Sequence, residues 1–249
     1  MPVFTGSKFG FGLSNEAGGA AAPAGHVASG GIISDYTVGS DKYRAHIFTS
    51  SGSFVISSLS ESFPATCDYF MVGGGGGGGS GHPTSSVGAG GGGGGGAATA
   101  TNLSVTAQTY SITVGTGGHG GVFNDNNNFY AGYNGYDSVI STPTVGIVTA
   151  YGGGGGASRI PGDPATPARS GGSGGGGTYP SPTPAQRYGH GLNPATPSPN
   201  LPTIGSNLTH PWPATQGYNG GTSPANAANP SGGGGGGAAG EGGDGAAVA

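Results

Sequence analysis

The chain has 249 residues, of which 62 are glycine and 19 are proline, so these two types make up about a third of it against roughly 12% in average proteins. Charged residues account for 6%, the formal net charge is −4, and there is one cysteine. These figures exclude an ordinary α/β enzyme domain, a coiled coil, a disulfide-stapled module and a nucleic-acid binder that works through a basic patch.

Targeting signals are not evident in the sequence. The first residues, Met1 to Lys8, contain no charged segment followed by an apolar one, so we expect no signal peptide and synthesis in the cytoplasm. No apolar run approaches the roughly 20 residues that a transmembrane helix needs, so we expect no membrane insertion. Cys67 lies among Tyr69, Phe70 and Met71, which predicts an inert, buried thiol.

The N-terminal part of the chain shows short segments that can form strands. Residues 1–40 carry scattered apolar side chains without helical spacing, which indicates extended segments that dock on another surface. Residues 42–48 alternate apolar and polar side chains, and the pattern resumes at 53–57 after a polar turn, so we predict a hairpin. Residues 67–72 then predict a strand that runs directly into the glycine run 73–79.

The middle of the chain repeats this arrangement after a second glycine run at 90–96. Residues 108–114 alternate most cleanly, with Tyr110, Ile112 and Val114 on one face of the predicted strand. We interpret residues 115–136 as a polar, aromatic loop that ends in a turn at Asn134-Gly135.

The C-terminal part begins with two more predicted strands. These strands, at 138–140 and 145–150, lead into the glycine run 152–156. Residues 158–231 hold most of the prolines, and a glycine- and alanine-rich tail follows from 232.

The glycine runs have two interpretations. Flexible linkers are commonly glycine-rich, but these runs are almost pure glycine, and strand-like segments lead into several of them. A threefold helix of the polyproline II type rises about 3.1 Å per residue, and only glycine lets such helices pack closely on all sides. We therefore favour a packed bundle of polyglycine II helices over a linker. The predicted fold class is all-β and irregular, with short antiparallel strands, a polyglycine II helix sandwich and almost no α-helix.

Five short motifs follow one another along the chain: Tyr43-x-x-His46-x-Phe48-x-x-Ser51-Gly52-x-Phe54, Tyr69-x-Met71-Val72-Gly73-Gly74-Gly75, Tyr110-x-Ile112-x-Val114-Gly115-x-Gly117-Gly118, Asn134-Gly135-x-x-Ser138 and Ala150-Tyr151-Gly152-Gly153-Gly154. In order and content they resemble the glycine-rich domain of bacteriophage tail-fibre and other virion proteins. The architecture is also similar to fibre-tip adhesins in which polyglycine helices stack in layers and variable loops bind the host receptor. The resemblance covers roughly residues 41–157.

The sequence contains no pattern typical of catalysis. Its carboxylates are scattered singly, its histidines do not fall at metal-binding spacing, and no phosphate-binding loop or nucleophile elbow is present. We therefore expect no enzymatic activity, no catalytic residues, no metal and no cofactor.

Aromatic residues are concentrated between the glycine runs, beside asparagine and histidine, as in adaptable recognition loops. Any single ring could instead pack in the core. We predict a surface that contacts a receptor or partner and contains Tyr130, Tyr133, Tyr188, His190, His210 and Trp212.

The predicted organisation is an N-terminal β region, 1–72, that serves attachment, and a glycine-rich polyglycine-helix domain, 73–249, with variable loops and a proline-rich loop region at 158–231. The resemblance implies a virion structural protein, most simply a tail fibre or tail-tip adhesin that binds a host-surface receptor. The alternative is a head decoration or fibre-joining protein whose loops contact other virion subunits. The expected partners are other virion proteins, including a fibre shaft, and a host glycan or outer-membrane protein. We expect no nucleic acid, and the number of copies in the assembly stays open.

Overall fold

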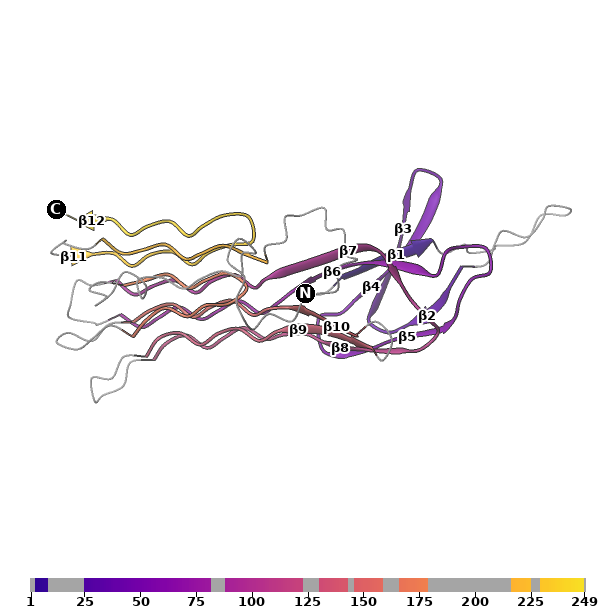
Figure 1. Ribbon diagram of the computed structural model, residues 1–249, viewed down its shortest axis with the longest axis horizontal. Coiled ribbons are helices and arrows are strands. Elements are labelled where there is room, and N and C mark those ends of the chain that lie inside the picture. The colour runs from indigo at the N-terminus through magenta and orange to yellow at the C-terminus, as the bar shows by residue number, and fades with distance from the viewer. Residues whose placement is uncertain are drawn as a thin grey trace, which may run out of the picture.

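The computed structural model describes residues 3–8, 25–81, 88–122, 130–142, 146–158, 166–178, 216–224 and 229–248. These residues form strands and extended segments, and none of them lies in an α-helix, which confirms the all-β prediction. The molecule is elongated, with two sheets at one end and a set of long extended segments at the other (Figure 1).

The two larger sheets each contain five strands, and all strand pairs are antiparallel. The first sheet has the order β3 (Ile32–Val38), β4 (Asp41–Ile47), β1 (Val3–Lys8), β6 (Thr66–Val72) and β7 (Ala97–Ser104). The second has the order β10 (Gly146–Ala150), β9 (Ser138–Thr142), β8 (Thr109–Thr113), β5 (Gly52–Ser58) and β2 (Val27–Ser29). A separate two-stranded sheet pairs β11 (Asn229–Pro230) with β12 (Ala247–Val248).

The core contains side chains from both larger sheets. Along β8 exposure alternates strictly, with Tyr110 and Ile112 buried as the sequence predicts. Phe54 lies opposite Tyr110 in the register of β5 and β8, and their ring centroids are 5.9 Å apart. From the first sheet, Tyr69 and Met71 of β6 join the same cluster.

The predicted hairpin across residues 42–57 is wrong, because β4 and β5 belong to different sheets. The connection at 48–51 crosses from one sheet to the other. Phe48 is only 3% exposed, so burying its ring in the core takes the place of a surface turn. The connection from β2 to β3 makes a similar crossing at Gly30 and Gly31, both with positive φ.

Strand β7 was not expected from the sequence. Four of its eight residues are alanine or asparagine, which are uncommon in strands. Ala98, Ala100 and Leu103 are nevertheless buried, and β7 pairs with β6 along its length. Packing against a neighbouring strand and the core therefore outweighs the weak intrinsic preference of alanine.

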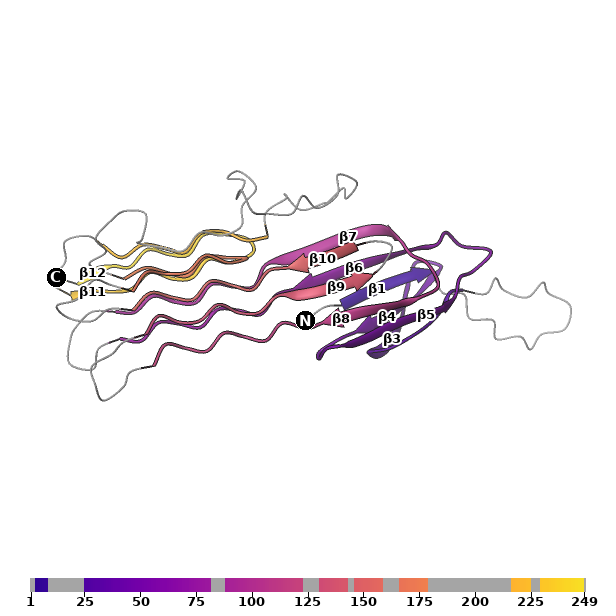
Figure 2. The same cartoon turned by 60° about the horizontal axis from the view of Figure 1, so that its bottom comes forward.

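Five strands continue into, or begin from, the extended segments. β6 leads into 73–80, β7 follows 88–96, β8 leads into 115–122, β9 follows 130–137, and β10 leads into 151–158. These segments extend from the sheets side by side as wavy ribbons, and neighbouring segments can run in opposite chain directions (Figure 2).

Hydrogen bonds between the extended segments recur at every third residue. The N–H groups of Gly73, Gly76 and Gly79 donate to carbonyls of 88–96, whereas those of Gly74, Gly77 and Ser80 donate to carbonyls of 130–137. A repeat of three residues is that of the polyproline II-type helix. This network confirms the packed polyglycine bundle and excludes the linker interpretation for the described runs.

The hydrogen-bond partners arrange the helices in two layers. In one layer the order is 115–122, 73–80, 88–96, 231–237 and 240–246. In the other it is 130–137, 151–158, 173–178 and 216–224, and 166–172 packs outside that layer against 151–158.

Two expectations about loops are therefore wrong. Residues 115–122 and 130–137 are helices of the bundle, and the predicted turn at Asn134-Gly135 lies inside one of them. Part of the predicted loop region 158–231 also belongs to the bundle, because 166–170 and 216–224 are bonded into it alongside the glycine run 171–177. A threefold helix accepts a side chain wherever that position faces outward, so a bundle helix need not be pure glycine.

Candidate functional site

Several helices end together at the end of the bundle that lies far from the two large sheets. The N–H of Gly79 donates to the carbonyl of Gly90, and the N–H of Gly121 donates to that of Gly78, so these helix ends lie at one level. The strands β11 and β12 lie at this far end as well (Figure 1).

Of the six predicted contact residues, the structure describes Tyr130 and Tyr133. It brings them together on the helix 130–137, which also carries Tyr136. The other four, Tyr188, His190, His210 and Trp212, lie outside the described residues, and their assignment stays a prediction.

Three tyrosines, Tyr130, Tyr133 and Tyr136, form a row along the outside of the bundle. Their backbone groups are used inside it: the Tyr133 N–H donates to the His119 carbonyl, and the Tyr133 carbonyl accepts from the Gly77 N–H, both at 2.9 Å. Tyr136 makes the equivalent bonds with Thr116 and Gly74. The side chains are 42%, 51% and 64% exposed, in chain order. The backbone bonding thus fixes three rings on the surface at a three-residue interval.

In two of the three triplets the position after tyrosine anchors this helix to the neighbouring helix 151–158. Asn134 Oδ1 accepts from the Gly155 N–H at 3.0 Å, and Asp137 Oδ1 accepts from the Gly152 N–H at 2.8 Å. Asn134 Nδ2 also donates to the Ser170 carbonyl at 3.0 Å. These side-chain oxygens act where a backbone carbonyl would otherwise be needed. They hold the tyrosine helix against the helix 151–158 of its own layer.

Arg169, from the helix 166–172, lies over the tyrosine row. Its guanidinium carbon is 5.3 Å from the centroid of the Tyr133 ring, within the range of a cation–π contact. The Arg169 N–H donates to the Gly155 carbonyl at 2.8 Å, so the backbone that carries this side chain is itself fixed in the bundle. The contact restricts the ring of Tyr133 and places a positive charge beside it.

The helix 115–122 carries a second row of side chains, which runs beside the tyrosine row. Thr116, His119 and Val122 recur at three-residue intervals and are exposed. Their carbonyls accept from the N–H groups of Tyr136, Tyr133 and Tyr130 respectively, so the two rows are in register. This edge of the bundle therefore presents an ordered, mixed aromatic and polar strip.

The opposite edge has a different character. The helix 240–246 carries Glu241 and Asp244, and the Thr222 N–H donates to Asp244 Oδ1 at 2.7 Å. That hydrogen bond, followed by one from the Thr222 hydroxyl, lowers the pKa of Asp244. Here the helix 216–224 carries Tyr218, which is half-buried, whereas the three tyrosines of the helix 130–137 are exposed.

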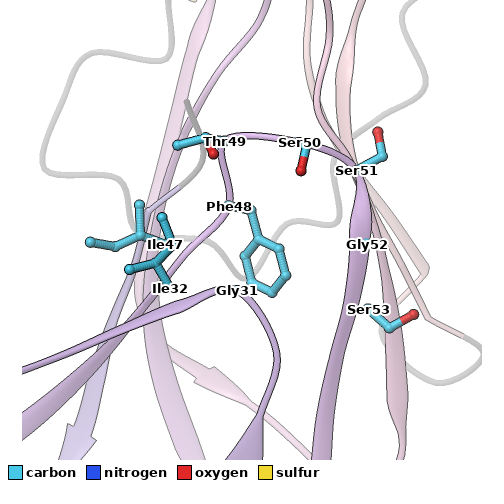
Figure 3. A pocket seen from close by; sticks show the side chains of 9 residues that line it. All are labelled: Gly31, Ile32, Ile47, Phe48, Thr49, Ser50, Ser51, Gly52 and Ser53. Atoms are coloured by element: carbon cyan, nitrogen blue, oxygen red, sulfur yellow. The ribbon is translucent and has the colours of Figure 1, made fainter.

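A small pocket of about 220 Å³ lies in the sheets, between the start of β3 and residues 47–53. The Phe48 ring lies between Gly31 and Gly52 in it (Figure 3). Its lining carries serine and threonine hydroxyls and isoleucine side chains, without a carboxylate or a histidine. This lining suits the packing of the Phe48 ring between the two sheets.

The described part of the chain offers little for metal binding or reactive chemistry. No group of three His, Cys, Asp or Glu residues there is placed to hold a metal ion. Burial raises the pKa of the Cys67 thiol to about 12, in agreement with the predicted inert thiol. The residues described include no helix long and apolar enough to cross a membrane.

The sequence alone did not single out Tyr136 or Arg169 as surface residues. The signal that could have found Tyr136 is the triplet pattern of 130–137, in which tyrosine, then alanine, asparagine or aspartate, then glycine recur. Arg169 could not have been found, because its contact depends on how separate helices pack.

A family model described as a glycine-rich domain matches residues 49–249, so the chain belongs to the glycine-rich domain family. No curated protein and no solved structure matches the chain significantly.

Proposed function

For this member of the glycine-rich domain family, we propose a role as a structural protein of a phage virion, most specifically a tail fibre or tail-tip adhesin. In this proposal the connections between bundle helices bind a receptor on the host surface, a glycan or an outer-membrane protein. The two-sheet end attaches the chain to a fibre shaft or another virion subunit.

The observation that carries the proposal is the rod itself, in which the helices 73–80, 88–96 and 115–122 run on from the sheets and end together at the far end. Backbone hydrogen bonds hold the rod together, and most of its inward positions are glycine. Glycine offers no side chain for selective contacts, so selectivity has to come from connections and outward positions. A rigid body whose far end carries chain connections suits recognition at a distance from an attachment point.

The exposed edge strand β3 supports attachment at the other end. Every residue of β3 is exposed, including Ile32 at 59% and Val38 at 60%. Exposed apolar side chains on an edge strand are typical of a surface that pairs with another chain.

Localisation on virions tests the proposal and separates it from the alternative. Antibody-labelled chain at the end of a tail fibre, seen by negative-stain electron microscopy, would support adhesion. Label over the capsid would support the head-decoration alternative, and label at a joint within the fibre would support the fibre-joining one. Absence from purified virions would refute both.

Replacement of Trp212 by alanine tests the recognition surface. We expect adsorption to host cells to be lost while the thermal midpoint of unfolding stays nearly unchanged. A large fall in that midpoint with adsorption intact would instead mean that Trp212 belongs to the core.

A further inference from the structure

The tyrosine row is a fixed feature of the rod and does not belong to the connections at its tip. Since the helix rises about 3.1 Å per residue, successive tyrosines are roughly 9 Å apart along a straight line. Each is held by backbone bonds to two other helices, 73–80 and 115–122. The rings therefore need little ordering when a ligand binds, which keeps the entropic cost of binding low.

The chemistry of the row suits carbohydrate. A tyrosine ring offers a flat apolar face and a polar hydroxyl, and a sugar ring likewise has apolar C–H faces and a rim of hydroxyl groups. A spacing of roughly 9 Å is about the length of two linked sugar rings. Successive tyrosines can therefore stack on alternate sugars of an extended chain.

The surroundings of the row favour a glycan over a protein surface. A protein–protein interface usually has a contiguous apolar centre, whereas these rings are separated along the helix by glycine, alanine and asparagine. His119 and Thr116 flank them on one side, and the Arg169 guanidinium lies over Tyr133. The strip is thus a line of separate stacking faces among hydrogen-bonding groups.

We propose that Tyr130, Tyr133 and Tyr136 form a track that binds an extended, linear glycan along the side of the bundle. Arg169 acts as a positioning residue that holds the Tyr133 ring. This inference rests on the proposed function, but it places glycan contact on the rod as well as at the tip.

Titration of the full chain with oligosaccharides tests the track. The probes are cello-oligosaccharides of increasing length and lipid-free bacterial O-polysaccharide, followed by calorimetry and by saturation-transfer NMR at the tyrosine signals. We expect affinity to rise once the oligosaccharide is long enough to reach a second ring. Loss of one ring by Tyr133→Ala should weaken binding about tenfold, whereas Tyr133→Phe should bind nearly as well as the unmodified chain.

The matched control is Tyr36→Ala. Tyr36 is 37% exposed and stacks on Tyr43 at 5.3 Å, but it lies in the β3–β4 hairpin outside the row. We expect it to leave glycan binding unchanged. Replacement of Arg169 by glutamine should weaken binding and also shift the NMR signals of the Tyr133 ring, which a loss of general stability would not do selectively.

Several outcomes would overturn the track: no saturable binding of either probe, equal binding by a variant with all three tyrosines replaced by alanine, or a row that binds a proline-rich peptide or a second copy of the chain instead. Failure of the track and failure of the proposed function can be told apart. Adsorption that depends on Trp212 without glycan binding at the row would refute only the track. Glycan binding at the row by a chain that is absent from virions would refute only the virion assignment.

Discussion

Two neighbouring glycines, Gly77 and Gly78, should respond in opposite ways to the same substitution. A Cβ atom at Gly77 would lie 2.0 Å from the His119 carbonyl oxygen and 2.4 Å from its carbon. At Gly78 the only atom within 4 Å would be the Gly90 carbonyl oxygen, at 3.8 Å. Neither glycine has a positive φ, so alanine fits the backbone at both positions and only the space around them differs.

The expected cost at Gly77 follows from the bonds that must stretch. Ordinary contact begins at 3.4 Å, so the helices 73–80 and 115–122 would have to separate by about 1.4 Å. That movement breaks the Gly118 N–H bond to Gly75 (2.8 Å) and the Gly121 N–H bond to Gly78 (2.7 Å). At about 1 kcal/mol for each bond, plus a desolvation penalty for groups left unpaired, the free energy of unfolding should fall by about 2–4 kcal/mol.

Gly78→Ala should instead leave the free energy of unfolding unchanged or raise it by about 0.4–1 kcal/mol, because alanine restricts the unfolded chain more than glycine does. Urea denaturation of the full chain, followed by tyrosine fluorescence, measures both variants. Equal losses at the two positions, or a greater loss at Gly78, would refute the assigned packing of the helix 73–80.

Three further predictions concern pH, thiol reactivity and helical phase. The His46 ring is 1% exposed, its Nδ1–H donates to the Gly30 carbonyl at 2.7 Å, and burial lowers its pKa from the ordinary 6.5. The unfolded chain therefore takes up a proton first as the pH falls, so the free energy of unfolding should fall as the pH drops below about 6.5. Denaturation curves at several pH values should show this fall for the unmodified chain and not for His46→Gln. With a pKa of about 12, Cys67 should react with a thiol reagent only after denaturant is added, and rapid reaction of the folded chain would contradict its burial. Three glycines inserted after Gly118 should lower the thermal midpoint less than two do. An insertion of three residues is a full helical turn, so every later side chain keeps the face it had. An insertion of two places the His119 side chain at the Gly121 position, where a Cβ meets the Tyr130 carbonyl oxygen at 1.9 Å. A lower midpoint for the three-residue insertion would contradict the three-residue repeat.

The strands with period-two alternation could be predicted from the sequence, whereas their partners could not. Tyr110 and Ile112 mark a half-buried strand through local pattern alone. The failed hairpin shows the limit, since residues 42–57 read equally well as two strands of one sheet or of two sheets. That choice depends on where the Phe48 ring is buried, and burial depends on contacts far away in sequence.

The bundle could be predicted where glycine is nearly pure and not where other residues interrupt it. Pure runs such as 73–79 indicate close approach on several sides. The helix 130–137 reads instead as a loop, because tyrosine, asparagine and Asn-Gly are the usual signals of turns. It packs in the bundle because glycine recurs at every third position on the side that faces the helix 73–80. A Cβ at Gly132 or Gly135 would lie 1.9 Å or 2.1 Å from a carbonyl oxygen of that helix.

The same phase rule determines what such a rod can offer to a partner. A β-strand in a sheet with one buried face presents every second side chain to solvent, whereas an edge helix of this bundle presents side chains only at positions that no neighbouring backbone approaches. Gly117 and Gly120 are such open positions, with nothing closer than 3.7 Å to an added Cβ, yet they are glycine. On the adjacent helix 130–137 each triplet begins with an exposed tyrosine. Packing requires glycine inside the bundle but does not require tyrosine outside it, so the choice of tyrosine at three successive outward positions points to a role in contact.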